Sequence, residues 1–352
     1  AMAWVEAENA RTVDVLQNDP NYPGMVKNAI AIATATDRIP MPSLIGGRVY
    51  NFWRDAEHPQ GIWRHTSADD YAQSNPRWTG ATCLEPEEKR CLISLSDGGE
   101  DATEIREFDL EAGSFVEGGF ALSTSKQGVD WVDGDTLIAS RDWGEGTLTA
   151  SGYPFVVKTL KRGAALSEAI EVFRGTKEDV GVWPAVLNDG AGNRAVIIVR
   201  SRTFFENDYI LVTPQGVRQL PLPAKSSLSG MIAGRVILKT SEPWSSGGVD
   251  VPTGSAVSVS LDDLRDGRTL TPTILFAPGP RQAVEQVATT RDHVILATTD
   301  NVRGRASVLT PTAEGWSPTA LDLPDNASIG ISAASDRDNR AYLSVTGFLQ
   351  PT

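Results

Sequence analysis

The chain has 352 residues, of which 40% are hydrophobic and 22% are charged, and its formal net charge is -13. This is the composition of a soluble globular protein, and no apolar run reaches the roughly 20 residues that span a bilayer. Because the chain is acidic and carries no block of Lys and Arg, we expect neither nucleic acid nor a membrane as a partner.

The amino-terminal residues predict helices. Residues along one side of the first helix recur at helical spacing: Val5, Asn9, Thr12, Val13 and Leu16. Residues 19–24 (DPNYPG) interrupt this pattern, and residues 25–33 (MVKNAIAIA) predict a second short helix. We therefore expect a helical segment over residues 1–38 that lies outside the repeats that follow.

A strand pattern recurs seven times after this segment. Each copy has a Gly, Asp or Asn turn, usually a basic residue, and then four or five β-prone residues. The copies start at Arg48, Arg90, Asp135, Arg194, Arg235, His293 and Arg340. Spacings of 41 to 59 residues, with further strand-like runs around each copy, are typical of propeller blades. We predict an all-β fold, a seven-bladed β-propeller over residues 39–352; a β-sandwich is the competing architecture.

Two long connections interrupt the repeats, at residues 143–154 and 242–254, in positions where binding groups are often mounted. The first contains Gly144, Gly146 and Thr149, which nearly match a dinucleotide fingerprint. That motif needs a helix whose N-terminus meets the phosphate, whereas strands are predicted on both sides. We interpret the stretch as a connection between two strands.

The sequence lacks the motifs of hydrolytic and metal-dependent enzymes. It contains no Gly-x-Ser-x-Gly, and the nearest matches, at Gly315 and Gly330, lack the second glycine. The three histidines do not have ligand spacing, and the Asp-rich residues 130–135 and 336–339 are interpreted as turns. We expect no catalytic residue, metal or cofactor in this chain.

The two cysteines, Cys83 and Cys91, are eight positions apart. On a hairpin they could form a disulfide, but such sparse cysteine usage favours two reduced, buried thiols. Because the sequence also has no signal-peptide h-region, it favours the cytoplasm, with the periplasm as the alternative.

Several stretches together resemble the prolyl oligopeptidase (prolyl endopeptidase) family of serine peptidases. They are WVEAENART at the amino terminus, YNFWRD and GIWRHT in the first repeat, CLISLSDGGEDATEIREFDL in the second, and SKQGVDWVDGDTLIASRDWGEGTLTASGYPFVVKTLKRG in the third. The resemblance covers the whole chain, but only the amino-terminal half of the family. The final residues, VTGFLQPT, resemble the middle of the family's last blade, which implies that this blade is incomplete. In that family, amino-terminal helices pack on a carboxy-terminal α/β-hydrolase domain, which carries the catalytic Ser, Asp and His of a serine endopeptidase.

The resemblance implies a substrate-gating propeller of a peptidase that cleaves short proline-containing peptides, with the hydrolase domain in cis and short peptides as partners. Five residues are candidates to face the substrate or that domain: Lys126, Arg141, Asp142, Tyr153 and Arg162. Lys126 stands where other members have an aromatic that lines the substrate pocket, so that role is not transferred. The alternative is a stand-alone propeller that binds a protein or ligand; a metal-dependent propeller enzyme such as a lactonase ranks last.

Overall fold

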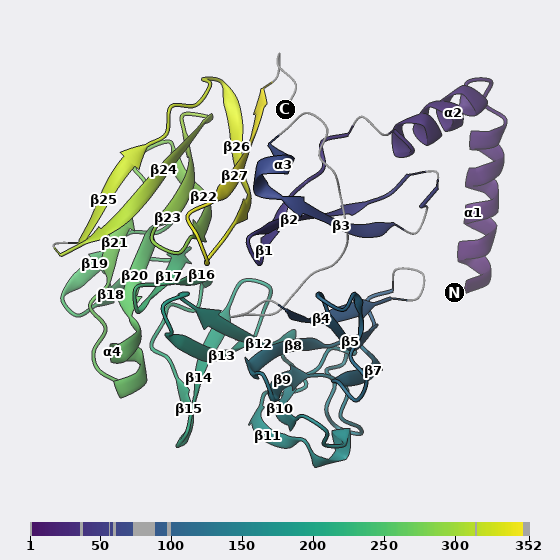
Figure 1. Cartoon of the computed structure of the whole chain (residues 1–352). Helices are drawn as coiled ribbons and strands as arrows, with labels where there is room; N and C mark the ends of the chain where they lie inside the picture. The colour runs from purple at the N-terminus through teal and green to yellow at the C-terminus, as the bar shows by residue number, and fades with distance from the viewer. Residues whose placement is uncertain are drawn as a thin grey trace.

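The computed structural model describes residues 2–35, 38–55, 57–58, 61–72, 89–96, 100–313 and 315–347. Its strands form small antiparallel sheets, each built from one stretch of chain, that follow one another around an axis (Figure 1). Consecutive strands within a sheet pair as hairpins because only short turns separate them.

Six of these sheets have three or four strands and are the blades of a β-propeller. Their strands are β1 (Ser43–Ile45), β2 (Arg48–Trp53) and β3 (Ile62–Ser67) in blade 1; β4 (Arg90–Leu95), β5 (Thr103–Asp109), β6 (Ser114–Phe115) and β7 (Ala121–Ser125) in blade 2; β8 (Gly128–Asp133), β9 (Thr136–Ser140), β10 (Val156–Lys161) and β11 (Ile170–Arg174) in blade 3; β12 (Gly181–Asn188), β13 (Arg194–Ser201), β14 (Asn207–Thr213) and β15 (Gly216–Gln219) in blade 4; β16 (Ser226–Ile232), β17 (Arg235–Thr240), β20 (Ala256–Ser260) and β21 (Thr273–Phe276) in blade 5; and β22 (Gln282–Thr289), β23 (Val294–Asp300), β24 (Arg303–Thr312) and β25 (Gly315–Ala320) in blade 6.

Two smaller sheets complete the described structure. β18 (Trp244–Ser246) and β19 (Val249–Val251) form a hairpin within the long connection between β17 and β20. β26 (Ala327–Ala334) and β27 (Ala341–Gly347) form a two-stranded sheet after blade 6.

The structure shows that the prediction of seven blades is wrong. All seven repeated segments form strands, namely β2, β4, β9, β13, β17, β23 and β27. However, β27 pairs only with β26 among the described residues, so the last repeat forms a hairpin and not a blade. The repeat pattern identified one strand per unit, whereas a blade also needs its neighbouring strands. The all-β propeller class is correct, with six blades.

The first strand of each sheet lies next to the axis. β8 contacts β12, β12 contacts β16, β16 contacts β22, β22 contacts β26, and β26 contacts β1. Between the same two sheets, the rings of Tyr71, which follows β3, and Tyr342 of β27 meet edge to face with centroids 5.0 Å apart. The ring therefore closes between blade 1 and the β26–β27 sheet through side-chain packing.

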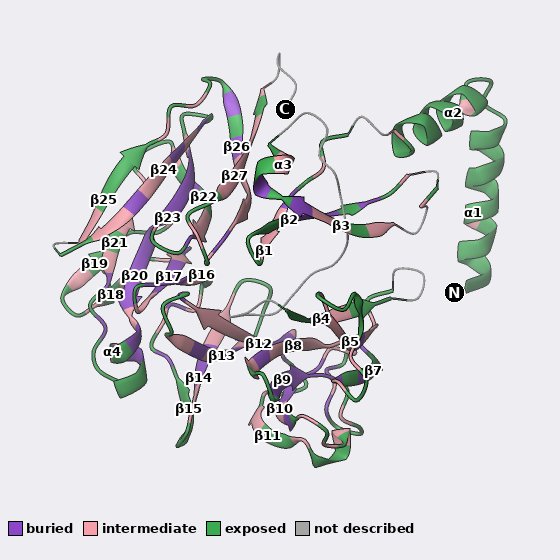
Figure 2. Cartoon of the chain, viewed as in Figure 1, coloured by how far each residue is buried: buried purple, intermediate pink, exposed green. Residues whose placement is uncertain are grey.

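The core lies between the faces of neighbouring blades, and the second strands are buried on both sides. In β9, Leu137 and Ala139 pack toward blade 2, whereas Ile138 packs with Val182 and Ile198 of blade 4. Figure 2 shows the buried residues concentrated along such strands. Because successive side chains of a strand point to opposite faces, a strand covered on both faces has a continuous apolar run.

The two predicted amino-terminal helices are confirmed as α1 (Met2–Gln17) and α2 (Tyr22–Ala33). Neither has a buried residue, and Figure 1 shows them standing to the side of the blades. The remaining helical elements are α3 (Ala68–Tyr71), α4 (Leu261–Asp266) and a 3-10 turn at Leu166–Glu168. Within the described ranges, no helix is both long enough and apolar enough to span a membrane. The domain division at residue 38 stays a prediction.

Cys91 corrects the expectation about the thiols. It lies at the start of β4 and is disulfide-bonded, not reduced. Cys83 lies outside the described residues.

Candidate substrate-facing site

The connections between second and third strands lie on one face of the ring, because neighbouring strands of a blade are antiparallel. We call this face the loop face. Phe204 and Phe205 form an apolar tip there, with 87% and 78% of their surface exposed, and Val302 at another tip is 91% exposed. Such exposed apolar groups are candidate contact points for a ligand or partner. In blades 3 to 6 the face carries residues 141–155, 202–206, 241–255 and 301–302.

The connection between β9 and β10 is folded on itself. Asp142 Oδ1 accepts a hydrogen bond from the Gly144 amide at 2.9 Å, and the Trp143 amide donates to Thr147 Oγ1 at 3.0 Å. Gly144 has a φ of 112°, which a side chain would disfavour. Strands flank the connection on both sides, as predicted, so its glycines shape the backbone and do not lead a helix to a phosphate.

Three side chains from separate segments meet beside this connection. Lys126, between β7 and β8, places its Nζ 4.2 Å from the Tyr153 ring centroid and 3.6 Å from Asp101 Oδ2. The Tyr153 hydroxyl donates to the same carboxylate oxygen at 3.3 Å. The Asp101 side chain is 69% exposed, so water screens this ion pair and it contributes less than about 1 kcal/mol to stability. These contacts instead hold the Tyr153 ring in one orientation.

Arg141, which directly follows β9, is buried, with 4% of its surface exposed. Its Nη2 donates to Ser123 Oγ at 2.9 Å and its Nε donates to the Asp142 carbonyl oxygen at 3.2 Å. Within the described part of the chain, Arg141 Nη1, Gln127 Oε1 and Ser140 Oγ have no hydrogen-bond partner. Burial lowers the pKa of Arg141, and the charge of Asp142 partly offsets this. Arg141 thus fixes the start of the β9–β10 connection.

Arg162 lies apart from the other four predicted residues. It follows β10 and donates to Glu107 Oε2 at 2.7 Å, to Glu107 Oε1 at 3.1 Å and to Asp135 Oδ1 at 2.8 Å. The hydrogen bonds to Glu107 raise the pKa of Arg162, although burial opposes them. Since Asp135 is in the turn between β8 and β9, Arg162 lies on the side opposite the loop face. The structure therefore brings Lys126, Arg141, Asp142 and Tyr153 together, without Arg162.

A cavity of about 750 Å³ opens on the loop face beside Tyr153. Its main walls are three aromatic side chains: Tyr153, Trp183 of β12, and Phe204 of the β13–β14 tip. The Tyr153 and Trp183 rings are nearly perpendicular, at 73°, with centroids 6.1 Å apart. Asp179 also lines the cavity, but Arg200 Nε donates to its carboxylate at 2.9 Å. The cavity is therefore an apolar pocket whose buried charge is already paired.

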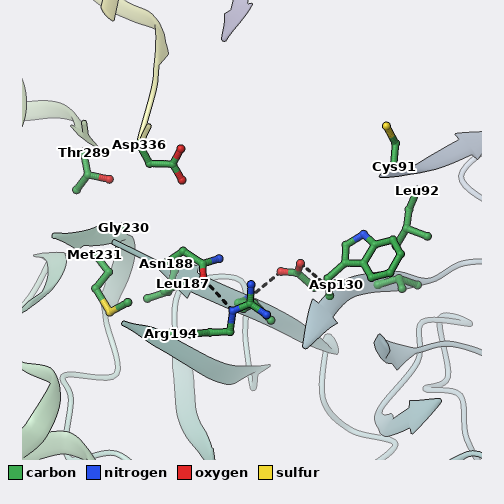
Figure 3. A pocket seen from close by; sticks show the side chains of 13 residues that line it. Cys91, Leu92, Asp130, Leu187, Asn188, Arg194, Gly230, Met231, Thr289 and Asp336 are labelled. Carbon is green, nitrogen blue, oxygen red and sulfur yellow. Dashed lines mark hydrogen bonds between the residues drawn. The ribbon is translucent and has the colours of Figure 1, made fainter. Parts of the chain in front are cut away.

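A second cavity, of about 410 Å³, lies at the axis, where first strands from several sheets meet. Figure 3 shows Asp130, Asn188 and Arg194 on one side of it, with Asp336 on another. Asp130 Oδ2 accepts the Val186 amide at 2.7 Å, and Arg194 Nε donates to Asn188 Oδ1 at 2.9 Å. Burial raises the pKa of Asp130, while backbone hydrogen bonds and the charge of Arg194 oppose the rise. The polar lining is thus held by contacts of its own.

The turn between β26 and β27 narrows the axis at this cavity. The Arg291 amide donates to the Asp338 carbonyl oxygen at 3.1 Å, and the Asn339 side chain donates to Asp292 Oδ2 at 2.7 Å, which fixes the turn to blade 6. Asp336 reaches the turn of blade 4 so closely that a Cβ at Gly190 would lie 2.5 Å from its carbonyl oxygen. The end of the axis opposite the loop face is therefore constricted.

Asp101, Trp183 and Phe204 were not predicted as site residues from the sequence. A signal for Phe204 was present, because two consecutive phenylalanines stand among polar residues in SRTFFEND. Nothing in the sequence connects Trp183 to Tyr153, since they come from different blades.

The whole chain, residues 1–352, matches the family described as prolyl oligopeptidase, N-terminal beta-propeller domain. Two curated bacterial relatives are uncharacterized peptidases: y4nA of Sinorhizobium fredii, 36% identical over 379 residues, and RP174 of Rickettsia prowazekii, 28% identical over 388 residues. The alignments cover 100% of this chain but 52% and 54% of the relatives. The chain thus spans about half the length of the curated relatives it matches.

Solved structures show the same likeness. A post-proline cleaving enzyme from Rickettsia typhi superimposes with a TM-score of 0.88 at 27% identity, covering 98% of this chain and 55% of that chain. A prolyl endopeptidase from a study of inter-domain dynamics superimposes with a TM-score of 0.67 at 20% identity, which shows a shared fold.

Proposed function

The chain belongs to the prolyl oligopeptidase family as its N-terminal β-propeller domain, and we propose that it is the substrate-gating cover of a peptidase that cleaves short proline-containing peptides. In this proposal the catalytic Ser, Asp and His belong to an α/β-hydrolase domain in the other half of the same polypeptide. The likeness to a post-proline cleaving enzyme, of which this chain covers 55%, supports cleavage of proline-containing peptides as the reaction. It also supports the assignment of the catalytic residues to the other half of the polypeptide.

The constricted axis is the observation that carries the gating role. The cavity there measures about 410 Å³, which is room for a few residues of extended peptide, and its polar lining is fixed by hydrogen bonds. A folded protein is far too large for a space of this volume. A cover of this kind keeps folded proteins and bulk water away from the reacting groups beneath it.

The amino-terminal helices supply a contact surface for the hydrolase domain. Trp4, Val15 and Ile32 are 69%, 67% and 73% exposed, and no residue of α1 or α2 is buried. Covering one such side chain completely would stabilise the assembly by roughly 1.5–3 kcal/mol. We therefore infer that α1 and α2 pack on that domain, together with the apolar tips of the loop face.

The predicted site residues take different parts in this proposal. Lys126 and Tyr153 face the space between the loop face and the hydrolase domain, where a peptide would lie. Arg141 and Asp142 hold the connection that carries Tyr153 and act as positioning residues. We assign Arg162 to the joint between blades 2 and 3.

The test compares substrates on two proteins, the full-length peptidase and this chain. The full-length protein should cleave a Gly-Pro chromogenic peptide and a short proline peptide. It should cleave the same sequence about 100-fold more slowly within a folded protein, which corresponds to nearly 3 kcal/mol of barrier. Unfolding that substrate should restore the rate. Equal rates on folded and unfolded substrates would refute gating, and phosphonate-sensitive turnover by this chain alone would refute the division of labour.

A further inference from the structure

We propose that the cavity at the axis binds the amino-terminal ammonium group of a short peptide, held by the Asp336 carboxylate and the Thr289 hydroxyl. We call it the axial cavity; it measures about 410 Å³ and is lined by the first strands of blades 2 to 6, by Arg194 and by Asp336. The inference rests on the proposed function in one respect, that peptides are the molecules that reach the axis from the loop face.

Asp336 supplies the unpaired charge of the axial cavity. Arg194 Nε donates to Asn188 Oδ1 at 2.9 Å, and the charge of Arg194 is offset by that of Asp130. Asp130 Oδ2 in turn accepts the Val186 amide at 2.7 Å. In the part of the chain that the structure describes, the Asp336 carboxylate has neither a hydrogen bond nor an ion pair. It faces the cavity in Figure 3, so the lining as a whole presents one uncompensated negative charge.

Thr289, at the end of β22, adds an unpaired hydroxyl to the same lining. Figure 3 shows Thr289 and Asp336 on the same side of the cavity. Among the described residues, Thr289 Oγ1 has no hydrogen-bond partner. A Cβ at Gly230 of β16, where φ is 146°, would lie 2.9 Å from Thr289 Cγ2. Glycine at this position therefore leaves room for the threonine side chain, which the neighbouring strand confines.

The turn that carries Asp336 is fixed in place. The Asn339 side chain bonds twice to one residue of blade 6: its Oδ1 accepts the Asp292 amide at 3.0 Å, and its Nδ2 donates to Asp292 Oδ2 at 2.7 Å. Within the turn, the hydroxyl of Ser335, which is 6% exposed, accepts the Arg337 amide at 3.3 Å. The backbone of Asp336 is thus held at the axis before any ligand arrives, and little order has to be created on binding.

These two unpaired groups select a cationic hydrogen-bond donor. A carboxylate offers only acceptor oxygens, and a hydroxyl can accept as well as donate. An ammonium group has three donors and a positive charge, so it can form a charge-assisted hydrogen bond to Asp336 and a second bond to Thr289. A carboxylate ligand would be repelled by Asp336. Calcium takes roughly six to eight oxygen ligands, whereas the described residues contain no group of three or more potential metal ligands.

The place of the axial cavity selects a chain end. The turn between β26 and β27 constricts the axis there, so a peptide that arrives from the loop face meets Asp336 with one of its termini. The amino terminus has the charge that suits Asp336, and the carboxyl terminus does not. The net charge of -13 also favours the approach of a positive group.

The experiment measures binding of three peptides to the 352-residue chain: triglycine amide, which has a free ammonium group, acetyl-triglycine amide, which is uncharged, and succinyl-triglycine amide, which has a carboxylate. The chain has four methionines, of which Met231 lines the cavity, so we would follow the Met231 methyl resonance after ¹³C labelling, assigned with Met231→Leu. Triglycine amide should bind roughly tenfold more tightly than the acetyl peptide, because only the former can form a charge-assisted hydrogen bond. The succinyl peptide should bind no better than the acetyl peptide.

Two variants of the same turn locate the binding. Asp336→Asn should weaken binding of triglycine amide by roughly tenfold and remove its advantage over the acetyl peptide. Asp338→Asn makes the same change in net charge, but Asp338 does not line the cavity and its carboxylate lies 3.5 Å from Arg340 Nη1, so binding should be unchanged.

Equal affinity for triglycine amide and the acetyl peptide overturns the proposal, and so does an equal loss in both variants. Because the assay needs neither hydrolase domain nor turnover, its failure leaves gating intact, and gating fails separately in the comparison of folded and unfolded substrates.

Discussion

Glu107 illustrates how single charged residues are used in this molecule. Its side chain is completely buried in blade 2, where it accepts hydrogen bonds from Arg162 of blade 3 and from the Phe120 amide at 2.8 Å. Arg90 lies 3.7 Å from the same carboxylate. When a buried carboxylate loses its partner, nothing offsets the cost of having removed it from water. Breaking the pair therefore destabilises the fold strongly.

We expect Arg162→Ala to lower the free energy of unfolding by about 2–3 kcal/mol, since Glu107 would keep only Arg90 as its charged partner. Urea denaturation measures this change. The matched control is Arg174→Ala, because the Arg174 and Glu171 side chains are 46% and 40% exposed. The control should lose less than about 0.5 kcal/mol. Similar losses in both variants would show that burial of the Glu107 pair is unimportant.

We expect the stability of the folded protein to depend on pH through Asp189. It is 2% exposed, and burial alone would raise its pKa, but hydrogen bonds from Asn193, Gly234 and Ala191 together bring the pKa below its ordinary value of 3.8. The folded protein therefore binds fewer protons than the unfolded chain between the two pKa values. The stabilisation is complete above pH 3.8 and is lost as the pH falls through the folded-state pKa.

Replacing Asp189 should accordingly cost stability at neutral pH and little in acid. We expect Asp189→Ala to lower the free energy of unfolding by about 2 kcal/mol at pH 7, because it leaves buried amides unpaired. The difference from the unmodified protein should shrink as the pH falls below 3.8. Asp262→Ala, at a side chain that is 76% exposed, should show neither effect. A difference that stays constant with pH would contradict the assignment.

Among the elements, the second strands carry the core. Ile138 in β9 is fully buried between blades 3 and 4, whereas Ile170 in the outer strand β11 is 68% exposed. We expect Ile138→Ala to cost about 2–5 kcal/mol through lost burial and the cavity left behind. Ile170→Ala should change stability by less than about 0.5 kcal/mol. Thermal unfolding of both variants tests this. Equal shifts of the unfolding midpoint would mean that the two strands contribute equally to stability.

This difference between strands also explains what the sequence could predict. Second strands are covered on both faces, so they read as continuous apolar runs, and those of six sheets were identified: β2, β9, β13, β17, β23 and β27. Outer strands such as β15 (Gly216–Gln219) are fully exposed and β6 (Ser114–Phe115) has two residues, so neither has a recognisable pattern. The repeat therefore could not distinguish a full blade from the β26–β27 hairpin, and the blade count was wrong. Likewise, Tyr153 was identified from its insertion, but the loop-face cavity also needs Trp183 and Phe204, which only the packing of blades 3 and 4 brings near.

For the whole molecule, the propeller should not depend on its amino-terminal helices. No residue of α1 or α2 is buried. Deleting residues 1–35 from this chain should therefore change the free energy of unfolding of the blades by less than about 0.5 kcal/mol. Circular dichroism should show the lost helix signal with an unchanged thermal midpoint. A marked drop in the midpoint would mean that the helices support the blades.

The contact between Tyr71 and Tyr342 has a mechanical consequence. It lies at the one junction of neighbouring sheets that joins the first and last sheets of the described chain, so no covalent link crosses it. Among the described residues, no strand ladder joins these two sheets. Separation of neighbouring sheets would therefore begin at this junction, where side-chain packing alone joins the first and last sheets of the described chain.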